Sequence, residues 1–499
     1  MNLSIIRFIL GSILKIQSFF FLLPIITAII YKENTLLPYL GIALLCLIIG
    51  IITTLKKPKD SVFYLKEGCV ATALSWILLS LVGCLPFYLT GEIPKFVDAF
   101  FETVSGFTTT GSSILSDVEA LSYSSLIWRS FTHWIGGMGV LVFLLAIVPM
   151  SGGSNINLMK AESPGPSVGK LVPKIRYTAR ILYLIYLGMT LAMFLFLLVG
   201  RMPIFDALCT TFGTAGTGGF GIKNSSMADY SPYIIWVTGI FMMLFGVNFN
   251  AYYLIIFHQV KKAFKMEEIR WYFGLIFAST LLIFINLYRI GMGGFESLTH
   301  AFFQVSSIIT TSGFATTDFN LWHESSKSIL ILLMFIGACA GSTGGGLKVS
   351  RLLILLKTIR KEITSYIHPK SVKKIKMDER PVEHEVVRSA NVYFITYIVI
   401  FALSLILISF DNKDFTTNFT AVTATFNNIG PGLETVGPTA NFSHFSSFSK
   451  MVLCFDMLAG RLELFPLLML FIPELWKDTI KPKKKPPHLK AKINNFYKK

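Results

Sequence analysis

The stretch DAFFETVSGFTTTG at residues 98–111 decides the fold, because three other parts of the chain resemble it. The second copy is DALCTTFGTAGTGG at 206–219, the third is HAFFQVSSIITTSG at 300–313, and the fourth is NFTAVTATFNNIG at 418–430. Each copy opens on a polar residue and ends on a glycine that follows it by 12 or 13 positions. This recurrence indicates one structural unit repeated four times.

Each copy lies between long apolar segments. The chain of 499 residues is 53% hydrophobic and 15% charged, whereas soluble proteins carry about 25% charged residues. A helix needs about 20 apolar residues to cross a membrane, and ten segments approach or exceed this length: 5–30, 37–55, 69–89, 126–150, 179–200, 234–257, 271–287, 329–356, 391–410 and 448–471. The apolar part of the first copy spans only about ten residues, which is too short to cross.

We therefore predict an all-α membrane protein with ten transmembrane helices. Four helix–pore-loop–helix repeats surround one central pore, and two extra helices precede them. Each repeated copy is expected to be a re-entrant helix followed by an extended stretch, which is tolerated at membrane depth only inside protein or beside water. The expected units are two N-terminal helices (1–60), pore repeats 1 to 4 (61–155, 156–265, 266–375 and 376–480) and a basic tail (481–499).

The basic residues orient these spans. One alternate set of connections holds 33 lysines and arginines and the opposite set holds 8. Positively charged loops stay in the cytoplasm, so both termini are expected there, with an even number of spans. The net charge of +17 is thus a topology signal and not a sign of nucleic-acid binding. We expect the six cysteines to be buried apolar residues, with no disulfide or metal site.

The repeated unit suits a monovalent cation. A short helix that points into the membrane presents about half a negative charge at its C-terminal end. The extended stretch after it can turn carbonyl oxygens inward to replace the water shell of the ion, and glycine adopts the backbone angles this requires at least cost. No carboxylate lies in these stretches, which argues against a divalent cation. The candidate filter residues are Thr109, Thr110, Gly111, Thr217, Gly218, Gly219, Thr311, Ser312, Gly313, Asn428, Ile429 and Gly430.

Other polar residues and motifs receive simpler interpretations. Asp98, Asp206 and Thr299 are expected to cap short helices and not to bind ions. The pattern Gly216-x-Gly218-x-x-Gly221 matches a dinucleotide fingerprint, but no strand–helix–strand unit surrounds it. A membrane enzyme would need clustered ionisable groups at one depth, which the sequence lacks, so we expect no enzyme activity. A channel-like conductor and a coupled symporter remain open, because both would use the same filter.

The eighth span is interrupted by ten small residues at 337–346, five of them glycine. Because each interior glycine costs about 1 kcal/mol relative to alanine, this stretch is either a loop across the permeation path or a surface for close helix packing. Arg461 is an intramembrane charge: it either lies near this stretch or pairs with Asp456 or Glu463. Lys348 belongs to the same cluster or is an ordinary cytoplasmic-side charge. Arg129 is expected to be structural, on the external side.

These segments resemble the Trk/Ktr/HKT superfamily of potassium transporters, and within it the TrkH family. The resemblance rests on four loop stretches: SGFTTTGSS at 105–113, GTGGFG at 216–221, TTSGFATTDFN at 310–320 and NNIGPGLETVGP at 427–438. Four further stretches extend it over almost the whole chain: WRSFTHWIGGMGV at 128–140, AESPGPSVGKLVPKIRYTA at 161–179, GSTGGGLKVSR at 341–351 and AGRLELFPLL at 459–468. The two spans before the first repeat are similar to TrkH and unlike the shorter KtrB arrangement of eight spans.

The resemblance implies uptake of K⁺, for which Rb⁺ is a surrogate, across a bacterial cytoplasmic (inner) membrane. In some plant members, serine in place of the first filter glycine accompanies sodium permeation; Gly111 stands here, which implies preference for K⁺ over Na⁺. A homodimer is implied, with a cytoplasmic ring of nucleotide-binding regulatory subunits of the TrkA type and no bound cofactor. The resemblance also implies an intramembrane gating loop; its candidate residues are Gly341, Ser342, Thr343, Gly344, Gly345, Gly346, Lys348 and Arg461.

Overall fold

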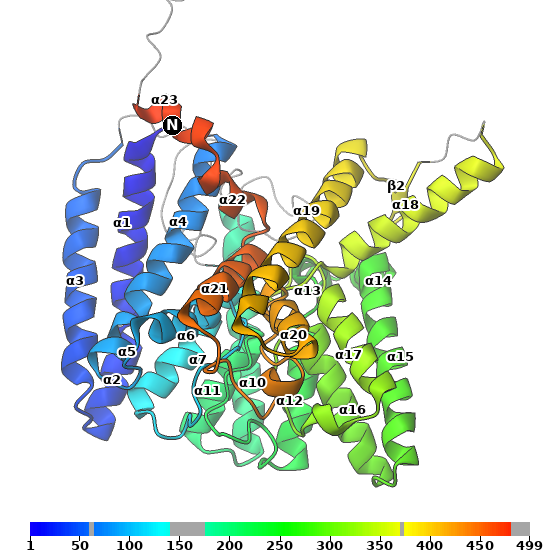
Figure 1. The fold of residues 1–499 in the computed structure, drawn as a ribbon, viewed down its shortest axis with the longest axis horizontal. Helices are drawn as coiled ribbons and strands as arrows, with labels where there is room; N and C mark the ends of the chain where they lie inside the picture. Colours follow the sequence, from blue (N-terminus) through cyan, green and yellow to red (C-terminus); the bar gives the residue numbers. More distant parts are fainter. Residues whose placement is uncertain (59–63, 140–174, 370–373, 481–499) are drawn as a thin grey trace, which may run out of the picture.

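The computed structural model describes residues 1–58, 64–139, 175–369 and 374–480. Most of these residues are helical (Figure 1). Within them, one small hairpin of β1 (Lys376–Met377) and β2 (Arg380–Pro381) forms the only sheet. The expectation of an all-α membrane protein, with two helical spans before four repeated units, is confirmed.

The N-terminal pair forms one flank of the molecule (Figure 1). Its first span consists of α1 (Leu3–Phe20) and α2 (Leu22–Tyr31), and its second span is α3 (Leu36–Thr54). Gln17 on α1 is buried and donates to the carbonyl of Leu79 on α4 at 2.9 Å, which ties the pair to the first repeat. The N-terminus and α23 (Pro473–Ile480) lie at the same end of the molecule (Figure 1), as the expected topology requires.

Each repeat has a first helix, a short pore helix and a second helix. Repeat 1 contains α4 (Leu65–Gly83), α5 (Leu85–Leu89), α6 (Phe96–Phe107) and α7 (Tyr123–Met138). Repeat 2 contains α10 (Ile175–Val199), α11 (Ile204–Ala215), α12 (Pro232–Phe245) and α13 (Phe249–Ile256), and α14 (Val260–Lys265) follows it. Repeat 3 contains α15 (Glu267–Arg289), α16 (Gly294–Ile309), α17 (Glu324–Ile336) and α18 (Val349–Ile367). Repeat 4 contains α19 (His384–Ile408), α20 (Phe415–Phe426), α21 (Ser447–Arg461) and α22 (Phe465–Leu468).

Short 3-10 turns complete the described secondary structure. They are η1 (Phe319–Leu321), η2 (Ser409–Asp411), η3 (Glu434–Val436) and η4 (Met469–Phe471). The pore helices α6, α11, α16 and α20 are each enclosed by longer helices, and almost all residues in their C-terminal halves are buried. The C-terminal ends of these four helices therefore lie inside the protein.

The expected spans differ in continuity. Six helices in the described part of the chain are long and apolar enough to cross a membrane, and α12 with α13 makes a seventh only as a pair bent by 91°. All the first helices of the repeats are among the six. Three of the second helices are not continuous: the expected spans 234–257, 329–356 and 448–471 are broken. Span 126–150 leaves the described residues after Gly139. Glycine-rich segments at these breaks lie directly against the ends of the pore helices.

The cap expectation is wrong. The pore helices begin earlier than expected, so Asp98 and Asp206 lie in the first turn, after cap residues Lys95 and Pro203. Asp98 pairs with Lys450 at 2.6 Å and Asp206 accepts from the Tyr230 hydroxyl at 2.9 Å. Thr299 lies inside α16 and accepts from the Trp236 indole at 3.0 Å. All six cysteines are buried, as expected: Cys46, Cys69, Cys84, Cys209, Cys339 and Cys454.

Candidate functional site

The four pore helices end in the same backbone turn. One residue in each turn adopts the left-handed conformation, with φ of 56° at Thr109, 54° at Thr217, 59° at Thr311 and 56° at Asn428. The N–H of the following residue donates to the carbonyl five residues earlier, at 2.8 to 2.9 Å in all four repeats. This is a Schellman motif, which usually has glycine at the left-handed position. A threonine or asparagine there is uncommon, so the fourfold recurrence marks a shared structural requirement.

The glycine that follows each turn also has positive φ, with values of 85°, 75°, 82° and 103° at Gly111, Gly219, Gly313 and Gly430. A Cβ on Gly111 would overlap the carbonyl oxygen of residue 218, one on Gly219 that of residue 312, and one on Gly313 that of residue 429. A Cβ on Gly430 would approach the carbonyl oxygen of residue 110 at 3.0 Å. Each repeat thus packs on the next, and the fourth packs on the first, which closes a ring.

This ring brings together the twelve predicted filter residues. All twelve lie in the four turns, and nine are buried, while Gly111, Gly219 and Gly313 are partly exposed. Polar side chains tie repeat 4 to repeat 1: Asn428 Nδ2 donates to Thr110 Oγ1 at 2.9 Å, and Ser112 Oγ donates to the Gly430 carbonyl at 2.9 Å. The turns therefore form one assembly of backbone carbonyls with glycine where the repeats meet.

The ring opens outward into a cavity of about 180 Å³. All four filter glycines line it, together with Ser112 and other polar residues of the loops that follow the filter. Among the described residues, Thr109 Oγ1 and Asn428 Oδ1 are buried oxygens with no hydrogen-bond partner. A buried oxygen without a partner is expensive, and a cation that gives up its water shell supplies such a partner.

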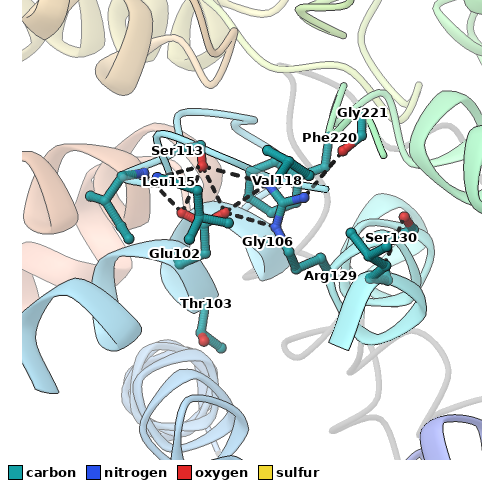
Figure 2. A network of polar contacts seen from close by, with 12 residues as sticks. Glu102, Thr103, Gly106, Ser113, Leu115, Val118, Arg129, Ser130, Phe220 and Gly221 are labelled. Carbon is teal, nitrogen blue, oxygen red and sulfur yellow. Dashed lines mark hydrogen bonds and ion pairs between the residues drawn. The ribbon is translucent and has the colours of Figure 1, made fainter. Parts of the chain in front are cut away.

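A buried ion pair supports the predicted filter segment of repeat 1 (Figure 2). Glu102 on α6 accepts from Arg129 Nε at 2.8 Å, and both side chains are at most 2% exposed. The same carboxylate accepts from Ser113 Oγ and from the backbone N–H of residue 114, just past the filter glycine. Arg129 also donates to the carbonyl of Gly221 at 3.1 Å and lies 4.0 Å from the centre of the Phe220 ring. The pair therefore joins the outer ends of filters 1 and 2.

His133 on α7 explains the glycine-rich filter of repeat 2. Its Nε2 accepts from the backbone N–H of Phe220 at 3.2 Å, so its Nδ1 carries the proton and donates to the Gly106 carbonyl at 2.8 Å. A Cβ on Gly218 would overlap the imidazole ring, and one on Gly216 would overlap the His133 backbone. Two of the three glycines that match a dinucleotide fingerprint, Gly216 and Gly218, are thus required by a neighbouring histidine.

Residues 337–348 form an irregular loop beneath the ring, between α17 and α18. The N–H of Gly345 donates to the filter hydroxyl of Thr311 at 2.6 Å. A Cβ on Gly344 would meet the carbonyl of residue 310, and one on Gly345 the carbonyl of residue 427. Thr343 Oγ1 donates to the Phe245 carbonyl at 3.2 Å. The loop therefore touches the pore-helix ends of repeats 3 and 4 and the end of the second helix α12 in repeat 2.

Two buried cations hold this loop. Arg461, at the end of α21, donates to the Thr343 carbonyl at 2.7 Å and to the Gly137 carbonyl of repeat 1 at 2.6 Å. Lys348, 2% exposed, donates to the Gly344 carbonyl. The acidic residues considered as partners of Arg461 have other contacts: Glu463 pairs with Arg351, and Asp456 accepts from Ser404 at 2.5 Å. The structure thus groups Lys348 and Arg461 with the loop.

Several supporting residues were not predicted. Glu102 carried a signal, because an ionisable residue inside a membrane-embedded helix is a functional candidate by default. Arg129 was expected to be structural, on the external side; the structure buries it and connects it to two filters. His133 and Glu268, which contacts the loop through Ala340, carried no local signal. Their positions depend on contacts between distant parts of the chain.

The fold and site define a class: a multi-pass membrane protein that conducts cations through a pore built from four repeats. A family model described as "TrkH: Cation transport protein" matches residues 41–295 and 294–481. The potassium uptake protein TrkH of Salmonella typhimurium is 35% identical over 96% of this chain and 100% of its own length. TrkG of Escherichia coli is 32% identical over the same shares. The chain belongs to the TrkH family of cation transport proteins.

The three-dimensional comparison agrees. The crystal structure of the potassium transporter TrkH from Vibrio parahaemolyticus superposes with a TM-score of 0.85, at 31% sequence identity. The match covers 95% of this chain and 100% of the other. The predicted family is therefore confirmed over nearly the full length, and with it a transport protein in place of an enzyme.

Proposed function

We propose that this chain takes up K⁺ through a selectivity filter formed by the four turns at residues 109–111, 217–219, 311–313 and 428–430. The observation that carries the proposal is the closed ring, in which each filter glycine packs on a carbonyl of the next repeat. A ring of carbonyls can replace the water shell of a cation. The ends of four pore helices add negative potential at the same place.

Potassium is the favoured ion for two reasons. The filter turns contain no carboxylate, so their oxygens suit a monovalent cation better than a divalent one. The relatives at 32 to 35% identity are named potassium uptake proteins. Glycine at all four equivalent positions further supports preference for K⁺ over Na⁺, because any side chain would displace the packed carbonyls.

The loop at 337–348 is proposed as the gate. It lies against the pore-helix ends of repeats 3 and 4 and the end of α12 in repeat 2, and two buried cations point at its carbonyls. At about 5 Å and an effective dielectric constant near 20, one such charge repels a passing K⁺ by roughly 3 kcal/mol before screening. A barrier of this size slows permeation about a hundredfold. Displacing the loop with its cations would remove both the obstacle and the charge.

The proposed setting is a bacterial cytoplasmic membrane with both termini inside, because the basic residues concentrate in one set of connections. That face carries α18, α19 and the hairpin between them (Figure 1). A nucleotide-binding cytoplasmic subunit of the TrkA type is proposed to act on this face, and the transporting form is proposed to be a homodimer. Protease or antibody access to a C-terminal tag in intact cells tests the orientation.

The decisive experiment is ⁸⁶Rb⁺ influx into liposomes that contain the purified protein, with K⁺ or Na⁺ as competitor. We expect K⁺ to inhibit influx at far lower concentrations than Na⁺. Gly219→Ala should weaken this discrimination, because its Cβ overlaps the carbonyl of residue 312. Gly91→Ala is the matched control: Gly91 has φ of 76°, against 75° for Gly219, but a Cβ there has no atom within 4 Å.

The two variants separate filter damage from general backbone strain. If both lose discrimination equally, or if Gly219→Ala keeps wild-type discrimination, the filter assignment is wrong. Equal inhibition of the wild-type protein by K⁺ and Na⁺ would contradict potassium selectivity itself.

A further inference from the structure

Glu268 occupies an unusual place at the start of α15. It is 4% exposed, although a buried carboxylate is rare unless hydrogen-bonded or paired. Its Oε1 accepts from the backbone N–H of Ala340 at 2.6 Å and from that of Ser350 at 3.2 Å. These two residues lie on opposite sides of the central part of the gate loop. One carboxylate oxygen therefore holds both ends of the loop together.

The position suits a hydrogen-bond acceptor. Ser350 lies in the first turn of α18, where backbone N–H groups lack partners inside the helix. The Glu268 carboxylate supplies one such partner. Glu268 thus acts both as a cap for α18, the helix after the loop, and as an anchor for Ala340 in the first part of the loop.

The same carboxylate reaches the break in repeat 2. Its Oε2 accepts from Asn248 Nδ2 at 3.2 Å, and Asn248 lies at the 91° bend between α12 and α13. Backbone bonds run beside this contact, from Cys339 N–H to the Gly246 carbonyl at 3.1 Å and from Phe249 N–H to the Gly341 carbonyl at 3.0 Å. The first half of the gate loop is therefore seated on repeat 2, with Glu268 at the junction.

The residue before Glu268 connects to the cytoplasmic hairpin. The backbone N–H of Glu267 donates to Asp378 Oδ1 at 2.7 Å. The Glu267 carboxylate accepts from Lys357 on α18 at 2.5 Å, and Lys357 also donates to the Lys376 carbonyl at 2.7 Å. Asp378 and Glu379 form the hairpin turn, both with positive φ, as in a type I′ turn. Adjacent residues of one helical turn thus hold the hairpin and the gate loop.

We propose that Glu268 is the positioning residue that clamps the gate loop in place, and that the hairpin at Lys376–Pro381, through Glu267, is where a cytoplasmic partner pulls on this clamp. The inference rests on the gate proposed above. A partner that displaces the hairpin rotates the first turn of α15, withdraws the Glu268 carboxylate from Ala340 and Ser350, and frees the loop. Coupling of this kind needs a physical element that both sites contact, and the turn Glu267–Glu268 contacts both the hairpin and the loop.

The test uses Cys339, which is fully buried in the gate loop, as a reporter. The purified full-length protein in liposomes is treated with N-ethylmaleimide, and mass spectrometry of its peptides measures the modification of each cysteine. The other five cysteines are also buried and report general unfolding. ⁸⁶Rb⁺ influx is measured on the same preparations.

Glu268→Leu removes both acceptors and should raise the modification rate of Cys339 at least tenfold, with a parallel rise in influx. Glu268→Gln keeps a neutral oxygen for the loop and should give a smaller rise, about threefold. Asp456→Asn is the matched control, a buried carboxylate that accepts from Ser404 and does not hold the loop. It should leave Cys339 at the wild-type rate.

Asp378→Ala tests the hairpin and should raise the Cys339 rate about threefold, because it releases the Glu267 N–H. Glu379→Ala is its control, the exposed neighbour in the same turn. If Cys339 in Glu268→Leu is modified at the wild-type rate, the clamp proposal is wrong. If Cys339 is modified at equal rates in Asp378→Ala and Glu379→Ala, the proposed role of the hairpin is wrong. A rise at all six cysteines would mean unfolding and would likewise overturn a specific clamp.

Deletion of residues 342–345 distinguishes this inference from the proposed gate. If the deletion raises influx while Glu268→Leu leaves Cys339 protected, the gate stands and the clamp is wrong. If the deletion conducts no faster than the wild type, the gate is wrong and the clamp proposal falls with it.

Discussion

The filter turns and the breaks in the second helices lie against one another but follow different rules. The four filter turns share one left-handed residue, one hydrogen bond and one glycine. The breaks described in repeats 2, 3 and 4 all differ: three residues separate α12 from α13, twelve residues separate α17 from α18, and three residues with two positive φ values follow α21. An ion at the centre of the ring needs equivalent carbonyl oxygens from all four repeats, and these require the same backbone conformation in each. A gate needs only one segment that obstructs the permeation path.

The side chains that hold the four filter turns differ between repeats, although the backbone of the turns is the same. Glu102 and Gln304 both lie nine residues before the filter glycine of their repeat. Glu102 binds Arg129 and the chain beyond the filter, whereas the Gln304 amide is fully buried and has no hydrogen-bond partner among the described residues. The same ring is thus braced by charge in repeat 1 and by packing in repeat 3.

The largest expected effect follows from this difference. Glu102→Leu should destabilise the protein by about 3–5 kcal/mol, because it leaves the Arg129 charge buried without its partner. Gln304→Leu, the matched change in repeat 3, should alter stability by less than about 1 kcal/mol or increase it, since it removes an unsatisfied polar group. Denaturant-dependent loss of the monodisperse elution peak measures both. Equal losses would contradict the asymmetry of support.

Deletion of Ser342–Gly345 tests whether the long break of repeat 3 obstructs the path. We expect partner-independent ⁸⁶Rb⁺ influx to rise about a hundredfold, equivalent to roughly 2.8 kcal/mol of barrier. Discrimination against Na⁺ should persist, because the filter turns are untouched. Correct assembly is checked by size-exclusion elution. An assembled variant with wild-type influx would make the stretch a packing surface.

Gly111→Ser tests the symmetry of the filter itself. The added side chain overlaps the carbonyl of residue 218, and extra atoms in a packed site cost about 1–3 kcal/mol. The Na⁺ inhibition constant for ⁸⁶Rb⁺ influx should therefore fall on the order of 30-fold. Gly430→Ser should have the smaller effect, because a Cβ there stays 3.0 Å from its nearest carbonyl. The reverse ranking would argue against the ring as the selective element.

Arg461→Ala should have the smallest effect of these changes on flux. It removes one cation from the loop but leaves Lys348, which still holds the Gly344 carbonyl. We expect influx to rise about tenfold, or roughly 1.4 kcal/mol. Arg461→Lys keeps the positive charge but loses the guanidinium hydrogen bonds to the carbonyls of residues 137 and 343. It therefore separates charge repulsion of the permeating ion from the hydrogen bonds that hold the loop. If the lysine variant conducts as fast as the alanine variant, the main role of Arg461 is to hold the loop through these hydrogen bonds.

Much of the architecture was predictable because its signals are local or periodic. Span length identifies the continuous first helices, and the spacing of Gly111, Gly219, Gly313 and Gly430 locates the turns. The breaks in the second helices were not predictable, because an apolar segment has the same composition whether its helix is straight or bent. The 91° bend at Asn248 and the break after Arg461 were therefore missed. Helix starts were also misjudged, because Lys95 and Pro203, not the aspartates, precede the pore helices.

The sequence by itself determined the repeated unit, the glycine positions, the poor helix at 337–346 and the basic bias, since each is written in neighbouring or evenly spaced residues. Only the tertiary structure decided which groups meet: His133 against Gly218, Arg129 between two filters, and Glu268 at both ends of the loop. The physical reason is that burial makes hydrogen bonds obligatory without specifying the partner. That partner comes from whichever distant segment the packing of four repeats brings within reach.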